Sequence, residues 1–157
     1  MKILLLAIAR TDDQYLARLI EMYQKRLGHY CPFEFETIPA SKKWAKLSTE
    51  QQKEAEGNVL LKYIEASDRI ILLDEKGKEF TSVGFAGFLQ KQMNSGIKRL
   101  VFVIGGPYGF SKEIYDRSTH KVALSRLTFS HQMVRLFFVE QLYRAFTILR
   151  NEPYHHR

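Results

Sequence analysis

The chain has 157 residues, of which 45% are hydrophobic and 26% are charged. This length accommodates one hydrophobic core, so we expect a single domain over residues 1–157. The composition is that of a globular protein and excludes a low-complexity or collagen-like chain. Lys and Arg number 24 against 17 Asp and Glu, which gives a net charge of +7. Such an excess favours a polyanionic partner, above all nucleic acid, although a solvated basic surface would also produce it.

The first nine residues imitate a signal peptide, with an apolar run that ends in Ala-x-Ala. The run is short for that role and leads directly into a charged helical pattern, so we interpret it as a buried strand. No later segment has the ~20 uninterrupted apolar residues that a membrane span needs. The lone Cys31 excludes an internal disulfide and a cysteine-based zinc site. We therefore expect a cytoplasmic protein without a metal or a membrane partner.

Three continuous apolar runs predict central strands at residues 3–9, 70–73 and 100–104. Continuous rather than alternating apolar residues indicate that both faces of a parallel sheet are covered. Residues 33–37 alternate apolar side chains with Glu and predict a half-exposed strand nearer an edge. Residues 122–124 are a weaker fifth strand.

Helical patterns lie between these strands. Residues 11–14 have the form of a capping box for a first helix that Gly28 can end. Residues 48–51 have the same form for a second helix, and a third spans residues 85–93 and stops near Gly96. Strands that alternate with helices predict an α/β fold with a mainly parallel sheet flanked by helices.

The last predicted helix, residues 131–150, has twelve apolar residues in twenty, and they fall on nearly every side of the helix. An ordinary surface helix has a single apolar stripe. This helix must therefore be covered twice, once by its own sheet and once by something else. In a small domain the second cover is most economically another copy of the chain, so we expect a homodimer.

Three segments could carry chemistry. Gly105 to Phe110 follows a strand, where ligands bind in open α/β sheets and glycines let the backbone approach them, yet a plain turn would look the same. The spacing fits neither the dinucleotide fingerprint nor the P-loop. Residues 124–132 could be only the start of a helix, capped by Thr128 or Ser130. The tail, residues 153–157, is either a passive end or a set of groups able to move protons and bind phosphate. Asp74, at a strand end, suits a ligand contact or a turn.

Together these segments resemble the small SPOUT methyltransferases and, within them, the family that methylates N3 of a pseudouridine in 23S ribosomal RNA. The resemblance covers essentially the whole chain, and the order and spacing of four motifs are specific. The motifs are Phe102-Val103-Ile104-Gly105-Gly106, Leu124-Ser125-x-x-Thr128-Phe129-x-His131-Gln132-Met133-x-Arg135, Glu140-Gln141-x-Tyr143-Arg144-Ala145 and Pro153-Tyr154-His155. The family usually has Pro where this chain has Ser130, which can cap the helix instead.

The resemblance implies a C-terminal trefoil knot, a homodimer packed through the last helix, and S-adenosyl-L-methionine (SAM) as the cofactor. Carried over by position, the residues of the SAM pocket are Leu73, Gly105, Leu124, Ser125, Arg126, Leu127, Thr128 and Phe129.

The resemblance also assigns the methyl acceptor, a pseudouridine in ribosomal RNA. We expect Tyr154 and His155 to hold or deprotonate that base, and Arg135 and Arg144 to contact RNA phosphates. Because so small a domain has little surface for selecting one loop among thousands of nucleotides, we expect the assembled ribosome to be the substrate. Two alternatives stay open: a knotted tRNA methyltransferase, and a non-catalytic module that binds RNA or the ribosome.

Overall fold

The computed structural model describes residues 1–156, which fold around one five-stranded sheet. The strand order is β2-β1-β4-β3-β5, and every neighbouring pair is parallel. The three predicted central strands lie in the middle of the sheet, and the strand predicted nearer an edge forms one edge. The weaker fifth strand, whose position was not predicted, forms the other edge. The strands are β1 (Lys2–Ile8), β2 (Phe33–Ile38), β3 (Arg69–Glu79), β4 (Arg99–Ile104) and β5 (His120–Ala123).

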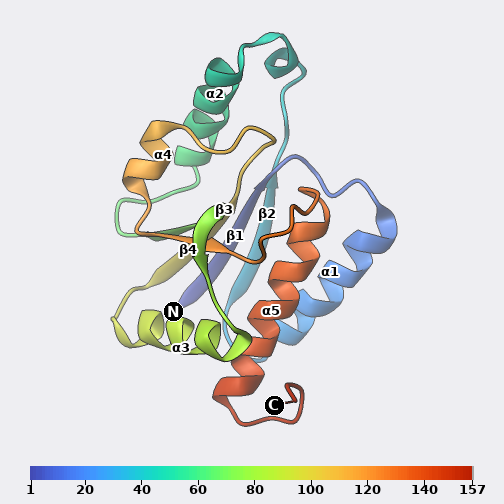
Figure 1. The fold of residues 1–157 in the computed structure, drawn as a ribbon, viewed down its shortest axis with the longest axis vertical. Coiled ribbons are helices and arrows are strands. Elements are labelled where there is room, and N and C mark those ends of the chain that lie inside the picture. Colours follow the sequence, from blue (N-terminus) through green and yellow to red (C-terminus); the bar gives the residue numbers. More distant parts are fainter. Residues whose placement is uncertain (157) are drawn as a thin grey trace.

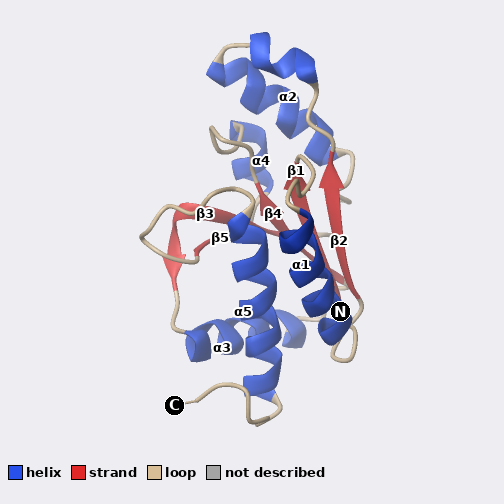
Figure 2. Ribbon diagram, turned by 90° about the vertical axis from the view of Figure 1, so that its right-hand side faces the viewer, coloured by secondary structure: helices blue, strands red, loops and turns tan. Residues whose placement is uncertain are grey.

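Helices cover both faces of this sheet (Figures 1 and 2). Successive residues of a strand point to opposite faces, so β1 contributes Ile3 and Leu5 to one core and Leu4 and Leu6 to the other. The first core holds α1 (Gln14–Leu27), α3 (Ser82–Asn94) and α5 (Met133–Leu149). The second holds α2 (Thr49–Leu61) and α4 (Lys112–Arg117), and Trp44 of the 3-10 helix η1 (Lys42–Lys46) packs against it. The predicted α/β fold is confirmed, whereas η1 and the short α4 were not predicted.

The start of α1 differs from the sequence prediction. The N-cap residue is Asp13, whose Oδ1 accepts from the backbone amides of Tyr15 and Leu16 at 2.7 and 3.1 Å. The predicted capping box at residues 11–14 is therefore wrong, because the helix begins two residues later. The capping box of α2, between Ser48 and Gln51, is confirmed in both of its hydrogen bonds.

Strand β3 continues beyond the predicted end at residue 73. Its pairing with β5 shifts register between Leu73 and Lys78, and Asp74 accepts a hydrogen bond from the Lys76 amide at 2.9 Å. At Gly77 an added Cβ would lie 2.6 Å from the backbone of Lys121 and Val122. Two backbones therefore touch directly here, which only glycine allows.

Cys31 is buried and free, and burial raises the pKa of its thiol to about 11. Across residues 1–156, no helix is both long and apolar enough to cross a membrane. In the same part of the chain, no three His, Cys, Asp or Glu side chains lie together as metal ligands would.

Candidate functional site

A cavity of about 530 Å³ lies at the carboxyl ends of β3 and β4. Its size is that of a site for a nucleotide-sized small molecule, and its position is where parallel α/β sheets bind ligands. Three chain segments build most of its wall: residues 73–76 after the regular part of β3, residues 104–110 after β4, and residues 124–131 between β5 and α5. Tyr115, Val122 and Val134 complete the lining.

Seven of the eight residues that we predicted for the cofactor line this cavity, namely Leu73, Gly105, Leu124, Ser125, Leu127, Thr128 and Phe129. Arg126 does not. Its guanidinium points away to Glu79, with Nε at 2.9 Å from Oε1, and its side chain is 89% exposed. An exposed ion pair therefore holds the Arg126 side chain outside the cavity, and a cofactor contact of this residue stays a prediction for its backbone alone.

The two glycines after β4 are required by packing. An added Cβ on Gly105 would lie 3.0 Å from the ring of Phe110, and one on Gly106 would lie 2.7 Å from Cδ of Glu56. Neither glycine has a positive φ, in contrast to Gly109 at φ +85°. The side chains of Phe110 and Glu56 therefore fill the space beside these two glycines. The loop packs against them and also borders the cavity.

The polar groups of the cavity gather around Asp74. The Tyr115 hydroxyl donates to Asp74 Oδ2 at 2.6 Å. Burial, followed by this hydrogen bond, raises the pKa of Tyr115 to about 12. The phenol therefore stays neutral and acts as a donor to Asp74. A carboxylate in a cavity with both polar and apolar walls suits a ligand that carries hydroxyls or a positive charge.

Arg135 was predicted to contact RNA, but its side chain is completely buried. Its guanidinium donates to the Ile8 carbonyl at 2.8 Å, the Thr11 hydroxyl at 3.0 Å and the His131 carbonyl at 3.0 Å. The prediction is wrong because every nitrogen of the guanidinium faces the protein interior. Arg135 instead ties the start of α5, beside the cavity, to the end of β1.

The C-terminal tail folds back onto α5 and is not a frayed end. Asn151 adopts a left-handed conformation, at φ 55°, that reverses the chain after the helix. The Tyr30 hydroxyl then donates to the Glu152 carboxylate, and the Glu152 amide donates to the Thr147 carbonyl at 2.9 Å. Tyr154 and His155 are consequently half-buried.

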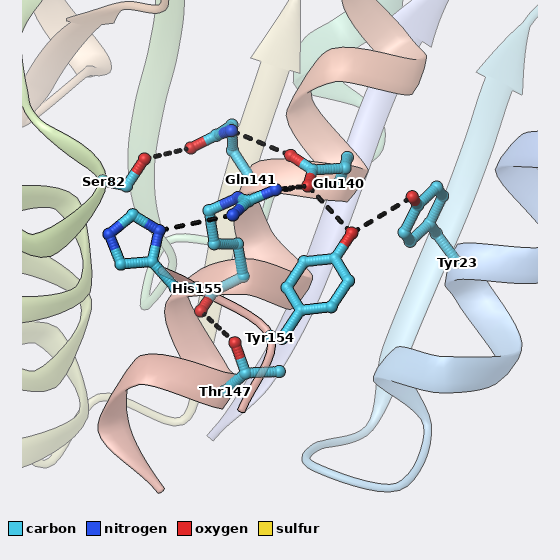
Figure 3. A network of polar contacts seen from close by, with 8 residues as sticks. Tyr23, Ser82, Glu140, Gln141, Thr147, Tyr154 and His155 are labelled. Carbon is cyan, nitrogen blue, oxygen red and sulfur yellow. Dashed lines mark hydrogen bonds and ion pairs between the residues drawn. The ribbon is translucent and has the colours of Figure 1, made fainter. Parts of the chain in front are cut away.

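Beyond this turn, Tyr154 and His155 join a polar network on α5 (Figure 3). Tyr154 donates to Glu140 Oε1 at 2.9 Å, and its hydroxyl lies 3.3 Å from that of Tyr23. Arg144 donates through Nε to the same carboxylate at 3.1 Å, lies 4.7 Å from the centre of the Tyr154 ring, and places Nη1 3.3 Å from His155 Nδ1. The network therefore joins a carboxylate, a guanidinium, two phenols and an imidazole.

This network provides hydrogen-bond donors rather than a ready base. Burial, followed by the bonds to Tyr23 and Glu140, raises the pKa of Tyr154, so its phenol remains protonated. Arginine has no acceptor, so His155 Nδ1 must accept from Arg144. In the neutral imidazole the proton then resides on Nε2, which can act as a donor.

The tail network and the cavity occupy opposite ends of α5. The cavity touches His131 and Val134, whereas the network rests on Glu140 and Arg144. Ten residues of α-helix between Val134 and Arg144 correspond to ~15 Å. Within one chain the structure does not bring Tyr154 and His155 to the cavity.

Comparison with known proteins identifies the relatives of this chain. A family model described as "Predicted SPOUT methyltransferase" matches residues 1–155. The chain belongs to the SPOUT methyltransferase family. Two relatives match over 157 residues and the full length of both chains, at 61% identity in Flavobacterium johnsoniae and 59% in Christiangramia forsetii. A third, in Parabacteroides distasonis, is 56% identical over 99% of each chain. All three are named ribosomal RNA large subunit methyltransferase H.

In this SPOUT methyltransferase, sequence reasoning missed Tyr115 and Glu56. Tyr115 lies in α4, a helix of six residues that is too short to produce a periodic signal. Glu56 lies on α2, where a glutamate is ordinarily solvated, and no sequence pattern marks it as buried. Glu140 stood inside a quoted motif, but its contact and that of Tyr23 with the tail depend on a chain reversal that spacing does not indicate.

Proposed function

We propose that this SPOUT methyltransferase transfers a methyl group from SAM to N3 of a pseudouridine in 23S ribosomal RNA, on the assembled ribosome. The observation that carries the proposal is the full-length identity of 59–61% to two proteins named for methylation of large-subunit ribosomal RNA. A cytoplasmic location goes with that substrate. The cavity and the tail network agree with the proposal, because they provide a small-molecule site and a separate set of polar groups for a nucleobase.

The residues of the cavity fit SAM. Leu73, Leu124 and Phe129 provide apolar walls for an adenine ring, and the Asp74 carboxylate suits ribose hydroxyls and the positive charge of the ligand. When bound, SAM would supply its sulfonium methyl group: the methyl–sulfur bond would break as the bond to N3 forms, S-adenosylhomocysteine would leave, and the N3 proton would pass to solvent. The protein then has mainly to orient two partners, and orientation can account for most of the acceleration.

A homodimer is part of the proposal. Large apolar side chains are exposed on two helices that pack against each other: Tyr15, Leu19 and Met22 of α1, and Met133 and Phe137 of α5. An exposed apolar patch of this kind marks an interface. An obligate dimer interface of roughly 2,000 Å² or more would cover it. Sedimentation at micromolar concentration should give twice the chain mass of 18.4 kDa. A stable monomer would contradict this part of the proposal.

The dimer would also complete the active site. Since the tail of one chain lies ~15 Å along α5 from its own cavity, we propose that Tyr154 and His155 act at the cavity of the partner subunit. The Nε2–H of His155 would hold a carbonyl of the target base, and Tyr154 would fix the imidazole through Glu140 and Arg144. Holding the base with N3 in line with the methyl group is the role that these donors can perform.

The RNA phosphates need other partners than Arg135. Arg144 is paired with Glu140, yet its side chain is 24% exposed, so it stays in the proposal as a phosphate contact. Lys42, Lys43 and Lys46 of η1 are exposed and, among residues 1–156, have no ion-pair partner. These lysines follow the carboxyl end of β2, and the cavity lies at the carboxyl ends of the parallel strands β3 and β4. They could therefore bind the phosphates of RNA that reaches the cavity.

The trefoil knot expected for the family is likewise proposed. Its support is the path of the C-terminal third, which leaves the edge strand β5, borders the cavity with residues 124–131, and returns as α5 between α1 and α3 (Figure 1). The direct contact between the backbone at Gly77 and that of Lys121 and Val122 agrees with a close crossing of two chain segments, as a knot requires.

The deciding experiment supplies labelled SAM together with ribosomes, free ribosomal RNA or tRNA, and locates the modified nucleotide. We expect label at N3 of one pseudouridine, from assembled ribosomes only. Label in tRNA would instead favour a knotted tRNA methyltransferase. Absence of SAM binding by calorimetry would favour a non-catalytic module that binds RNA or the ribosome.

A further inference from the structure

A buried carboxylate packs against the loop Gly105–Phe110, which borders the cavity. Glu56 projects from α2, and its side chain is only 3% exposed. Its carboxyl group fills the space beside Gly106, where an added Cβ would lie 2.7 Å from Cδ. Gly106 in turn lines the cavity. A single backbone segment thus separates the carboxylate of Glu56 from the ligand site.

The groups around Glu56 stabilise its charged form without neutralising it. Gln52 donates through Nε2 to Oε1 at 3.1 Å, and the Gly106 amide donates to the carboxylate as well. Burial raises the pKa of Glu56, and these two hydrogen bonds oppose the rise. Within residues 1–156, no Lys, Arg or His forms an ion pair with Glu56.

A buried carboxylate without a cation is costly, and an apolar side chain on this face of α2 would pack at lower cost. The arrangement makes sense if the carboxylate acts on the loop. We infer that Glu56 is a positioning residue, which holds the Gly105–Gly106 backbone in the conformation that binds the cofactor. This inference rests on the proposed function, because it takes SAM as the ligand.

The first test compares Glu56→Gln with the wild-type protein and with Glu54→Gln, an exposed glutamate on the same helix. Glutamine keeps the size of the side chain but removes the charge that the Gly106 amide meets. SAM affinity, measured by calorimetry, should fall about tenfold, the usual effect of losing a charge-assisted hydrogen bond. KM for ribosomes and the rate at saturating SAM should change little. Glu54→Gln should match the wild type throughout.

The second test uses the contact between Glu56 and Gly106. Gly106→Ala alone drives a methyl group into the carboxylate, so SAM affinity should fall at least tenfold. In a Glu56→Ala protein the space is open, so adding Gly106→Ala should cost little further affinity. This coupling is specific to the proposed contact, because a general loss of stability would make the two effects add. Because this comparison uses Glu56→Ala, it tests the positioning role even if Glu56→Gln does not fold.

The outcomes separate this inference from the function beneath it. If the wild-type protein does not bind SAM, the proposed function fails. If the wild type binds SAM and Glu56→Gln binds it equally well, the positioning role of Glu56 is wrong. It is also wrong if the affinity losses of Glu56→Ala and Gly106→Ala simply multiply in the double variant.

Discussion

Each end of α5 carries an arginine, and the two arginines differ in burial and in hydrogen-bond partners. At the amino end, Arg135 is completely buried and donates to two carbonyls and a hydroxyl. At the carboxyl end, Arg144 is partly exposed and shares the Glu140 carboxylate with Tyr154. Arg135 has no counter-ion among its hydrogen-bond partners, and it fixes backbone beside the cavity. Arg144 has a counter-ion and holds side chains that can still reach a substrate.

This difference separates two halves of one chemical task. The amino end borders the cavity, and under the proposed function rigidity counts there, because backbone and apolar surface would hold the cofactor. The carboxyl end carries hydrogen-bond donors on a tail that turns at Asn151. Since ~15 Å of helix separates the two ends, one end can be altered without the other, and this makes the comparison testable.

The largest effect is expected from the tail. Deletion of residues 153–157, or His155→Ala, should lower single-turnover methylation at saturating ribosomes about 100-fold or more, because an orienting donor is needed mostly in the transition state. SAM affinity and dimerisation should stay near wild type, since Glu152 and its bond to Tyr30 remain. If both variants keep the wild-type rate at saturation, the tail serves binding only. Recovery of the rate at low salt would indicate a phosphate contact.

Mixed dimers test whether the two ends meet across the subunit boundary. Gly105→Val should abolish SAM binding, because the added side chain presses on the Phe110 ring of the cavity wall. A heterodimer of one Gly105→Val chain and one His155→Ala chain, isolated through two tags, then has one intact site formed in trans. It should recover about half of the wild-type rate. Heterodimers no more active than the parental homodimers would locate the site within one chain.

Stability should distinguish the two arginines. Arg135→Met leaves the buried Ile8 carbonyl and the partly buried acceptors of Thr11 and His131 without their donor, so the free energy of unfolding should fall by about 3 kcal/mol. Arg144→Met removes a partly exposed pair and should cost about 1 kcal/mol or less. Urea unfolding at one fixed protomer concentration measures both changes. Equal losses would mean that burial does not separate the two ends.

The contrast also defines what the sequence could predict. The central strands β1, β3 and β4 were predictable because buried parallel strands are continuous apolar runs. Most of the cavity was predictable because ligand sites in such sheets follow strand ends. The helix at residues 131–150 had the right place and character, since its apolar side chains reflect burial on several sides.

The uses of individual charged residues were not predictable. Arg135 and Arg144 read alike in a sequence, and only the loop after β1, folded over the start of α5, buries one of them. Arg126 lies inside a cavity-lining segment, yet Glu79 draws its side chain away. The carboxylate of Glu56 and the reversal at Asn151 depend on contacts between segments distant in sequence, which no local pattern records.

The smallest effect is expected at Tyr154, and its pH dependence distinguishes a holding role from a base. Burial and the bonds to Tyr23 and Glu140 raise the pKa of this phenol above its ordinary value of 10.0. A raised pKa keeps the phenol protonated until the pH is higher than a free tyrosine would require. Between about pH 6 and pH 9 the wild-type group therefore does not titrate and only donates.

Tyr154→Phe removes one hydrogen bond to Glu140 and should slow single-turnover methylation about fivefold. Because the phenol is neutral throughout, the ratio of wild-type to variant rate should stay constant across that pH range. If the phenolate were the base, the wild-type rate would rise about tenfold per pH unit, and the variant would lose this rise. A ratio that grows with pH would therefore overturn the holding role, and with it the view that the carboxyl end of α5 acts by donating hydrogen bonds.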